Sequence, residues 1–262
     1  MKNKALATVV AIANQKGGTG KSTTAAALAA GLTAKRHKTL LIDMDGQGNT
    51  TDTVAAATGD ATIFSVLTEA TPIAKAIQAT DGHGDVIPSD PELADMDSIL
   101  TKTGKDYRLQ KTLEPILGQY EYIIIDTPPA LGILTVNALT AATGTIIPSA
   151  ADKYGFSGIK QLRGTIDAVR QFTNPPLKIY GVLLTKHTTR RILLRDYADN
   201  TADLARDMKT KVFKSFIREC TAVREAQSRR QSIFEYAPQS TAAEDYTAFV
   251  AEFIKTAGKR NG

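Results

Sequence analysis

The sequence predicts an α/β domain in which helices cover both faces of a parallel sheet. Three observations favour this fold class. Short apolar runs rich in β-branched residues recur along the chain, segments with helical spacing separate them, and three of the runs lead into Asn14, Asp43 and Asp126. Because ligands of such sheets bind outside the carboxyl ends of the strands, we expect a site at this edge.

Five apolar runs have the length and composition of buried parallel strands. Two further segments are candidates for shorter strands. The five runs span residues 8–13, 38–42, 122–125, 145–148 and 179–185, and the shorter candidates span residues 86–87 and 211–217.

Helices are expected between and after the strands, where apolar residues recur at helical spacing or alanine is abundant. Residues 52–118 are expected to be mostly helical, with prolines marking the interruptions. The other predicted helices span residues 22–34, 158–172, 190–208 and 242–257. No repeat, low-complexity tract or linker divides the sequence, so we expect one domain over residues 1–262, without an N-terminal helix-turn-helix domain.

Composition and charge narrow the class of protein. Hydrophobic residues make up 42% of the 262 residues and charged residues 23%, which is typical of a globular chain with a buried core. The net charge of +5 favours a polyanionic partner such as nucleic acid, but scattered lysines in contact with solvent would give the same total. The single cysteine, Cys220, cannot form an internal disulfide, and no run approaches the ~18 apolar residues of a membrane span. We therefore expect a cytoplasmic protein.

A glycine-rich loop, Gly17–Ser22, lies between the first predicted strand and an alanine-rich helix. Its last three residues, Gly20, Lys21 and Ser22, match the end of the P-loop pattern, although Gln15 replaces the first glycine of that pattern. Glycines let backbone N–H groups converge on phosphate oxygens, and the start of the next helix adds a positive field there. Lys21 adds a full charge, and the Ser22 hydroxyl can hold Mg²⁺. The loop therefore predicts a P-loop NTPase.

Lys16 places a second ammonium group at the start of this loop. Two such groups close together cost electrostatic energy unless an anion lies between them. The sequence leaves three arrangements open: the side chain points to solvent, reaches a phosphate of its own nucleotide, or reaches a phosphate held by a second copy of the chain.

Residues 16–23 (KGGTGKST) resemble the deviant Walker A motif, KGGxxGK[ST]T, of the ParA/MinD group of ATPases. Residues 40–49 (LLIDMDGQGN) resemble the second motif of the family, and residues 123–139 resemble its Walker B strand and the segment after it. Residues 224–226 and 238–252 resemble the C-terminal pattern of ParA proteins. Within the group, the sequence is most similar to ParA partition ATPases.

The resemblance implies ATP and Mg²⁺ as cofactors and a role for each matching residue. Lys16 is similar to the signature lysine, which contacts the nucleotide of the opposite subunit in a sandwich dimer, and Asp45 is similar to the aspartate that positions the attacking water. The implied metal site comprises Ser22, Asp43 and Asp126. The implied catalytic residues are Lys16, Lys21 and Asp45, and the implied nucleotide-binding residues are Lys16, Gly17, Gly18, Thr19, Gly20, Lys21, Ser22 and Thr23.

The second motif departs from the family pattern at one position. Gly46 stands where the family usually has proline, and we expect it to loosen the loop. Asp-Gly is also a common turn dipeptide, so a purely structural role for Asp45 stays open. The implied chemistry is in-line phosphoryl transfer to water, with ATP closing the dimer and hydrolysis opening it.

Residues 186–230 hold twelve basic and six acidic side chains, an excess larger than the net charge of the whole chain. This pattern fits contact with DNA phosphates independent of sequence, and the family resemblance implies ATP-dependent, non-specific DNA binding. For any one arginine, a solvated helix face or a salt bridge remains an alternative. The candidate DNA contacts are Arg190, Arg191, Arg195, Arg218 and Arg224.

These observations lead to the interpretation of the chain as a ParA-like partition ATPase. The resemblance implies a nucleotide-dependent homodimer, a nucleoid-associated location and a ParB-like centromere-binding protein that stimulates hydrolysis; a membrane partner is not expected. The alternative is a MinD-like membrane-positioning ATPase, because the apolar and basic tail around Phe249 and Phe253 resembles a membrane helix, although a helix packed on the core shows the same pattern. Cys220 alone cannot supply the two cluster cysteines of an electron-transfer ATPase, and a non-enzymatic nucleotide-dependent scaffold remains a further alternative.

Overall fold

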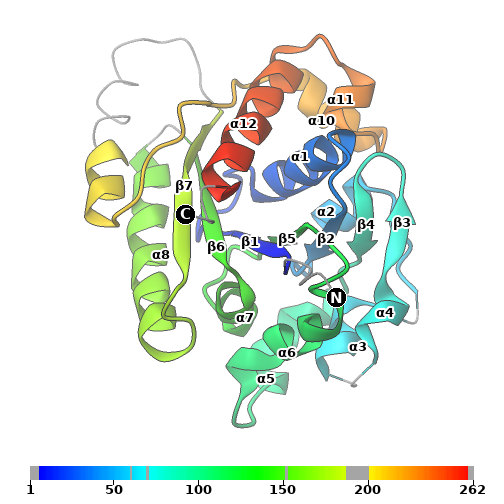
Figure 1. Cartoon of the computed structure of the whole chain (residues 1–262), viewed down its shortest axis with the longest axis vertical. Helices are drawn as coiled ribbons and strands as arrows, with labels where there is room; N and C mark the ends of the chain where they lie inside the picture. The colour runs from blue at the N-terminus through cyan, green and yellow to red at the C-terminus, as the bar shows by residue number, and fades with distance from the viewer. Residues whose placement is uncertain (1–5, 60, 69–70, 151–152, 187–200, 259–262) are drawn as a thin grey trace, which may run out of the picture.

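A seven-stranded sheet forms the centre of the computed structural model, which describes residues 6–59, 61–68, 71–150, 153–186 and 201–258 (Figure 1). The strand order is β3-β4-β2-β5-β1-β6-β7. All neighbouring strands are parallel except β3 and β4. The strands are β1 (Thr8–Ile12), β2 (Thr39–Asp43), β3 (Gln78–Thr80), β4 (Gly84–Ile87), β5 (Tyr122–Asp126), β6 (Gly144–Ala150) and β7 (Lys178–Thr185).

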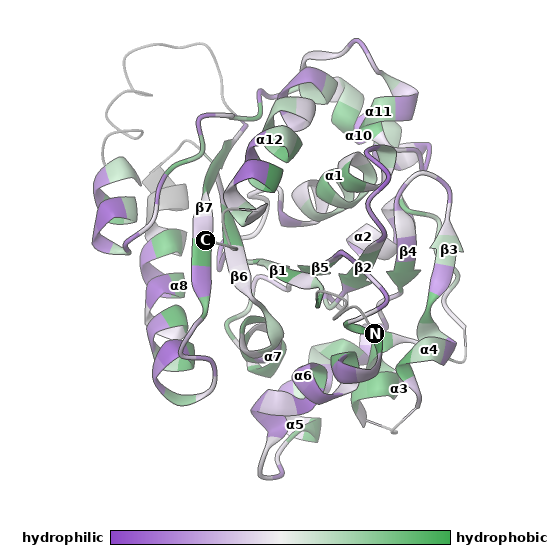
Figure 2. Ribbon diagram, viewed as in Figure 1, coloured by the Kyte–Doolittle hydropathy of each residue, from purple (hydrophilic) through white to green (hydrophobic). Residues whose placement is uncertain are grey.

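Helices cover both faces of this sheet, which confirms the predicted fold class (Figure 1). Because alternate residues of a strand point to opposite faces, Val9 and Ala11 pack with α7 and α8, whereas Val10 and Ile12 pack with α1 and α12. In Figure 2, α8 carries both hydrophobic and hydrophilic residues, as expected for a helix with one side on the sheet. The four helices are α1 (Lys21–Ala34), α7 (Ile133–Ala141), α8 (Lys153–Phe172) and α12 (Thr241–Gly258).

Shorter helical elements fill the connections between strands and helices. They are α2 (Asn49–Thr53), α3 (Ile63–Thr68), α4 (Ile73–Ala76), α5 (Met96–Ile99), α6 (Arg108–Leu113), α10 (Thr221–Ser228) and α11 (Ile233–Tyr236), with the 3-10 turns η1 (Pro91–Asp95), η2 (Lys105–Tyr107) and η3 (Glu114–Ile116). Residues 201–207 are also helical, and the part of the predicted helix at residues 190–200 lies outside the described residues. The sequence pattern does not predict α7, α10 or α11.

The five predicted parallel strands are confirmed, and residues 86–87 belong to β4. β3 is not predicted, because it is short and polar and lies at the edge of the sheet, where it pairs antiparallel with β4. Residues 52–118 contain this hairpin as well as short helices, so they are less helical than expected.

The predicted strand at residues 211–217 is wrong. Within this segment only Val212 pairs with β7, through one isolated bridge to Val182. The backbone N–H groups of Lys214 and Ser215 donate instead to the carboxylate of Glu252 in α12, at 3.0 and 2.9 Å. The N–H groups of Phe213 and Ile217 do donate to Val182 and Leu184 of β7, but a side chain of α12 interrupts the ladder between them.

The apolar residues of the C-terminal helix face the core. Phe249, Val250 and Phe253 of α12 are fully buried and belong to the cluster formed with α1 and one face of the sheet. Of the two alternatives for this segment, the structure has the helix packed on the core. None of the helices in the described part of the chain combines the length and the apolar character needed to cross a bilayer.

Candidate active site

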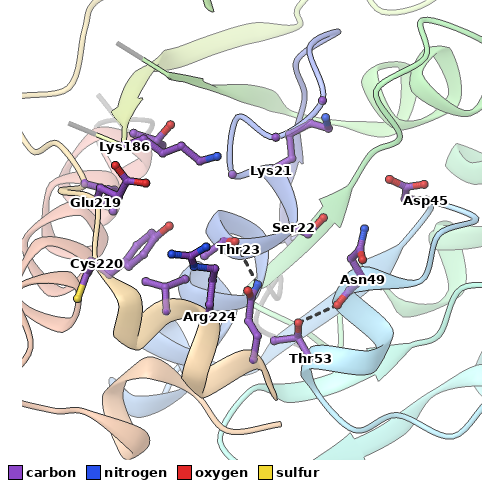
Figure 3. A pocket seen from close by; sticks show the side chains of 18 of the residues that line it. Lys21, Ser22, Thr23, Asp45, Asn49, Thr53, Lys186, Glu219, Cys220 and Arg224 are labelled. Carbon is purple, nitrogen blue, oxygen red and sulfur yellow. Dashed lines mark hydrogen bonds between the residues drawn. The ribbon is translucent and has the colours of Figure 1, made fainter. Parts of the chain in front are cut away.

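A cavity of about 730 Å³ opens at the carboxyl edge of the sheet, beyond the ends of β1, β2, β5 and β7 (Figure 3). Its walls are the glycine-rich loop with the start of α1, the segment from Asp45 to Thr53, the end of β7, and α10 with the residues before it. The predicted site residues that line it are Gly17, Gly18, Gly20, Lys21, Ser22, Thr23, Asp45, Arg218 and Arg224. Lys16, Thr19, Asp43 and Asp126 are not among its lining residues.

The glycine-rich loop depends on two glycines in the left-handed region. Gly18 has φ +72° and Gly20 has φ +83°, values that other residues adopt only with strain. Gly20 is also the N-cap of α1, so the first N–H groups of this helix point toward the loop. Thr19 is held from β7, because the Thr185 hydroxyl donates to its carbonyl at 2.9 Å. The loop is therefore held by the end of β7 as well as by the start of α1.

Lys21 is the first residue of α1 and is almost completely buried, with 7% of its surface exposed. Its Nζ donates to the carbonyl of Lys16 at 3.2 Å. Burial lowers the pKa of Lys21, and the nearby carboxylates of Asp126 and Asp45 oppose that shift. A buried ammonium group at a helix N-terminus gives the loop a concentrated positive charge that suits an anionic ligand.

Two buried carboxylates lie behind the loop. Asp43 and Asp126 end the adjacent strands β2 and β5, at the same level of the sheet. Thr51 donates to Asp43 Oδ2 through its N–H at 2.8 Å and its hydroxyl at 2.7 Å, and the Thr50 hydroxyl donates to Asp126 Oδ2 at 2.7 Å. Burial raises the pKa of both carboxyl groups, and repulsion from Asp43 raises the pKa of Asp126 further.

The surroundings of Asp126 fit a magnesium ion. Asp126 Oδ1 is buried and has no hydrogen-bond partner among the described residues, while Ser22 lies near enough to lower the pKa of this carboxyl group. Oxygen is the ligand that Mg²⁺ prefers, and the ion usually keeps several waters and binds substrate phosphates. The described residues contain no group of three or more Asp, Glu, His or Cys side chains that could hold a metal. Of the predicted set, Ser22 and Asp126 would hold the ion together with water and phosphate, whereas both oxygens of Asp43 already accept hydrogen bonds, from Asp45 and Thr51.

Asp45 lies on the loop after β2 and lines the cavity, with 8% of its surface exposed. Its Oδ1 accepts a hydrogen bond from the N–H of Gln47 at 3.1 Å, which closes a turn. Its Oδ2 accepts none from the residues that the structure describes. The turn role and the proposed catalytic role therefore use different oxygens of one carboxylate, so they are compatible.

Gly46 lies close to the backbone of η1. A Cβ atom added to Gly46 would lie 3.2 Å from the N atom of Ala94 and 3.4 Å from the carbonyl oxygen of Pro91. Both neighbours are backbone atoms, which cannot rotate out of the way. The glycine thus lets the loop that carries Asp45 pack directly on η1.

Lys16 shapes the loop through its backbone. Its carbonyl accepts hydrogen bonds from Lys21 Nζ at 3.2 Å and from the Thr19 hydroxyl at 3.3 Å. Its N–H donates to Asn14 Oδ1 at 3.1 Å, and the Asn14 amide donates to the carbonyl of Pro148 at 2.7 Å. Asn14 therefore ties the start of the loop to β6, while Lys16 is not among the residues that line the cavity.

The five arginines predicted to contact DNA are placed differently from one another. Arg190, Arg191 and Arg195 lie outside the described residues. Arg218 forms a two-point ion pair with Asp245, with Nε–Oδ2 at 2.9 Å and Nη2–Oδ1 at 2.7 Å, and Nη2 also lies 3.2 Å from Glu244 Oε2. Arg224 is exposed on α10 and lines the cavity (Figure 3).

Several cavity residues carry no signal that the sequence patterns reveal. Lys186 reaches the cavity from the end of β7, Tyr246 from α12, and Gln227 from α10, where its amide donates to the Thr23 hydroxyl at 3.2 Å. Asn49, at the start of α2, also lines the cavity. Asn49 ends the LLIDMDGQGN segment, and Tyr246 lies within residues 238–252, the segment that resembles the C-terminal family pattern. The others come together only through the fold.

Comparison with known proteins finds relatives over nearly the whole chain. A family model described as an AAA domain matches residues 7–179. The chain is 35% identical over 251 residues to the chromosome partitioning protein ParA of Myxococcus xanthus (strain DK1622), an alignment that covers 94% of this chain and 88% of the relative. It is 37% identical over 248 residues to the sporulation initiation inhibitor protein Soj of Bacillus subtilis (strain 168), with 93% and 97% covered.

A solved structure shares the fold and the ligand type expected for this cavity. The crystal structure of cobyrinic acid a,c-diamide synthase from Mycobacterium smegmatis, with bound ATP analogue and magnesium, superposes with a TM-score of 0.81 at 31% identity. The superposition covers 94% of this chain and 93% of that one.

Proposed function

This chain belongs to the ParA family of partition proteins, and on that basis we propose that it is a partition ATPase that uses ATP and Mg²⁺. It hydrolyses ATP to ADP and phosphate. The observation that carries this proposal is the meeting of one buried ammonium group, Lys21, with the carboxylates of Asp45 and Asp126 beside a glycine-rich loop at the carboxyl edge of the sheet.

Each group of this cluster has a defined task in phosphoryl transfer. The loop N–H groups and the N-terminus of α1 bind the phosphates, and Lys21 neutralises charge on the β- and γ-phosphates. Asp45 orients the attacking water through Oδ2, because its Oδ1 is already bound to Gln47. A bound Mg²⁺ would neutralise further charge on the phosphate oxygens, and Ser22 and Asp126 would hold it.

Lys16 supplies the link between hydrolysis and dimerisation. Its side chain lies outside the lining of its own cavity, which supports the arrangement in which it reaches the nucleotide of a second copy. The ATP-bound homodimer is then the active form. Hydrolysis removes the phosphate that Lys16 contacts, and the dimer opens.

DNA binding in the ATP state is supported by the basic segment, residues 186–230, although its members contribute unequally. Arg218 already has its charge paired with Asp245, so we expect it to contribute little. Lys214 and Arg229 are exposed, and neither forms an ion pair within the described part of the chain. Contacts of this kind are to phosphates, so binding is independent of sequence and weakens with salt. The nucleoid is the location that such binding favours, and a ParB-like protein is the proposed activator.

The membrane-positioning alternative is less well supported. The apolar residues that would enter a bilayer, Phe249, Val250 and Phe253, are buried against α1 and the sheet. Exposing them would cost the core a large part of its packing on that face.

The deciding experiment measures binding to a random-sequence DNA duplex with ATP, with ADP and without nucleotide, at two salt concentrations. We expect tight binding with ATP only, weakened at the higher salt concentration. The control is Lys21→Ala, which should bind neither ATP nor DNA. Phosphate release is measured in parallel, because turnover separates the enzyme from a nucleotide-dependent scaffold. DNA binding that ignores the nucleotide, or an absence of it in every state, contradicts the proposal, and binding to anionic liposomes would then support the membrane alternative.

A further inference from the structure

Lys186 occupies a defined place beside the glycine-rich loop. It follows Thr185, the last residue of β7, which is 3% exposed and whose hydroxyl donates to the carbonyl of Thr19 at 2.9 Å. A Cβ atom added to Gly20 would lie 3.8 Å from the Thr185 methyl group. The end of β7 is therefore packed on the loop, and it fixes where the backbone of Lys186 lies relative to the loop.

The ammonium group of Lys186 lies on the cavity side. Figure 3 shows its side chain extending from the end of β7 toward the glycine-rich loop, from the side opposite to Asp45. A Cβ atom added to Gly18 would lie 3.9 Å from Lys186 Nζ. Gly17 and Gly18 are the exposed apex of the loop, so the ammonium group lies where the loop faces the cavity.

The backbone of Lys186 has an unusual conformation. Its φ is +52°, a region that residues other than glycine, asparagine and aspartate rarely adopt. Such a conformation persists where the surrounding structure imposes it, and it often marks a ligand site. Here the imposed conformation coincides with a side chain that lines the cavity.

No carboxylate of the residues that the structure describes pairs with the charge of Lys186. The carboxylates that act on Lys21 are Asp126 and Asp45. Two ammonium groups thus lie beside one glycine-rich loop, Lys21 from the start of α1 and Lys186 from the end of β7. Their mutual repulsion disappears when an anion with several charges lies between them.

We propose that Lys186 is a second phosphate-binding lysine, whose ammonium group contacts the phosphate chain of the bound nucleotide from the β7 side of the loop. This proposal rests on the proposed ATPase function and names a further ligand of the same site. A lysine binds phosphate as a point charge, so one rotatable ammonium group is sufficient. Lys186 is the first basic residue of the segment 186–230. Its role differs from that of the proposed DNA contacts, because its side chain extends toward the glycine-rich loop.

Lys209 offers a matched control for this proposal. It is also an exposed lysine with a left-handed backbone, φ +54°, and it also forms no ion pair within the described residues. It lies at the opposite end of β7, where it lines a separate hollow with Lys178 and Lys211. Lys186→Gln and Lys209→Gln therefore remove the same charge from the same kind of backbone, and only one of them faces the nucleotide cavity.

The experiment measures the affinity of the full chain for fluorescent ATP and ADP by titration, for the wild type, Lys186→Gln, Lys186→Arg and Lys209→Gln. We expect Lys186→Gln to weaken the binding of both nucleotides by about tenfold, the effect of one charge-assisted contact at an exposed position. Lys186→Arg should recover most of the loss, and Lys209→Gln should bind as the wild type does. Circular dichroism checks that each variant is folded.

Wild-type nucleotide affinity in Lys186→Gln would overturn the proposal without touching the ATPase function. If DNA binding at saturating ATP is weaker in the same variant, Lys186 is a DNA contact instead. A different result would contradict the proposed ATPase function itself, namely nucleotide binding that is retained in Lys21→Ala.

Discussion

Asp43 and Asp126 end neighbouring strands at the same level of the sheet, both without solvent exposure, and one oxygen of Asp126 has no partner among the described residues. Two carboxylates placed in this way repel each other, and burial removes the water that would screen them. The arrangement costs folding free energy until a cation binds. The two buried carboxylates therefore lower the free energy of unfolding, while their negative charge favours the binding of a cation.

Asp126→Asn should therefore raise the stability of the metal-free protein and lower its ATP turnover. The amide keeps an acceptor for the Thr50 hydroxyl but removes the buried charge, so in EDTA and without nucleotide we expect a melting temperature a few degrees higher, as about 1 kcal/mol gives in a domain of this size. ATP turnover should fall by roughly a hundredfold or more, the loss expected when charge stabilisation in the transition state is removed. The control is Asp167→Asn, which removes one exposed charge from α8. A lower melting temperature in Asp126→Asn would contradict the repulsion between the two carboxylates.

Asp45→Ala tests the division of labour between the two oxygens of this carboxylate. We expect ATP-dependent dimerisation to persist, because the loop N–H groups and Lys21 that hold the phosphates are unchanged. Turnover in single-turnover phosphate release should fall by roughly 10²-fold or more, since no group then orients the water. Asp45→Asn keeps an acceptor for the N–H of Gln47 and should be equally slow. If Asp45→Ala turned over normally, Asp45 would be a turn residue only.

Arg218 and Arg229 should respond oppositely in stability and DNA-binding assays. Arg218 binds Asp245 with two nitrogens and is structural in this position, so Arg218→Ala should lower the melting temperature and change DNA affinity little. Arg229 is exposed, with no ion pair among the residues that the structure describes, so Arg229→Ala should weaken ATP-dependent DNA binding severalfold without a change in melting temperature. The reverse result would return Arg218 to the DNA interface.

Gly46→Ala should distort the loop that carries Asp45. The added methyl group would lie 3.2 Å from the backbone N atom of Ala94, so η1 or the loop must shift. We expect a loss of roughly 1–2 kcal/mol in the free energy of unfolding, in the range of other overpacked sites, together with slower turnover. Gly118→Ala is the control, because no atom lies within 4 Å of the added Cβ there. Denaturant unfolding measures the free energy of unfolding of the two variants. Equal values would show that η1 shifts without cost and would contradict this prediction.

The parts of the fold that follow from local pattern are predictable from the sequence. Buried parallel strands are apolar over their whole length, as residues 122–125 illustrate, and the glycine-rich loop has fixed spacing. The segment at residues 211–217 has equally good strand composition, yet the carboxylate of Glu252 accepts hydrogen bonds from the N–H groups of Lys214 and Ser215 in the middle of the segment. That competition comes from a helix distant in the sequence, so no local pattern reveals it.

The residues of the candidate site are likewise predictable only where they stand in a local sequence motif. Lys21 and Asp126 stand in motifs, whereas Lys186 and Gln227 reach the cavity from β7 and α10 only because the chain folds back over the loop. Counting charged residues identifies a basic segment, but it does not reveal which of its side chains form ion pairs in the fold. Arg218 counts as positive in the sequence, although Asp245 neutralises it in the fold.

The attachment of residues 211–217 to α12 also bears on the order of events during synthesis. α10 forms a wall of the cavity, and the segment that leads to it is held by Glu252 and Asp245, which emerge from the ribosome later than α10 itself. The glycine-rich loop and its strands are made long before. A nascent chain therefore carries a phosphate loop without its wall until α12 has been translated, and we expect it to acquire full nucleotide affinity only then.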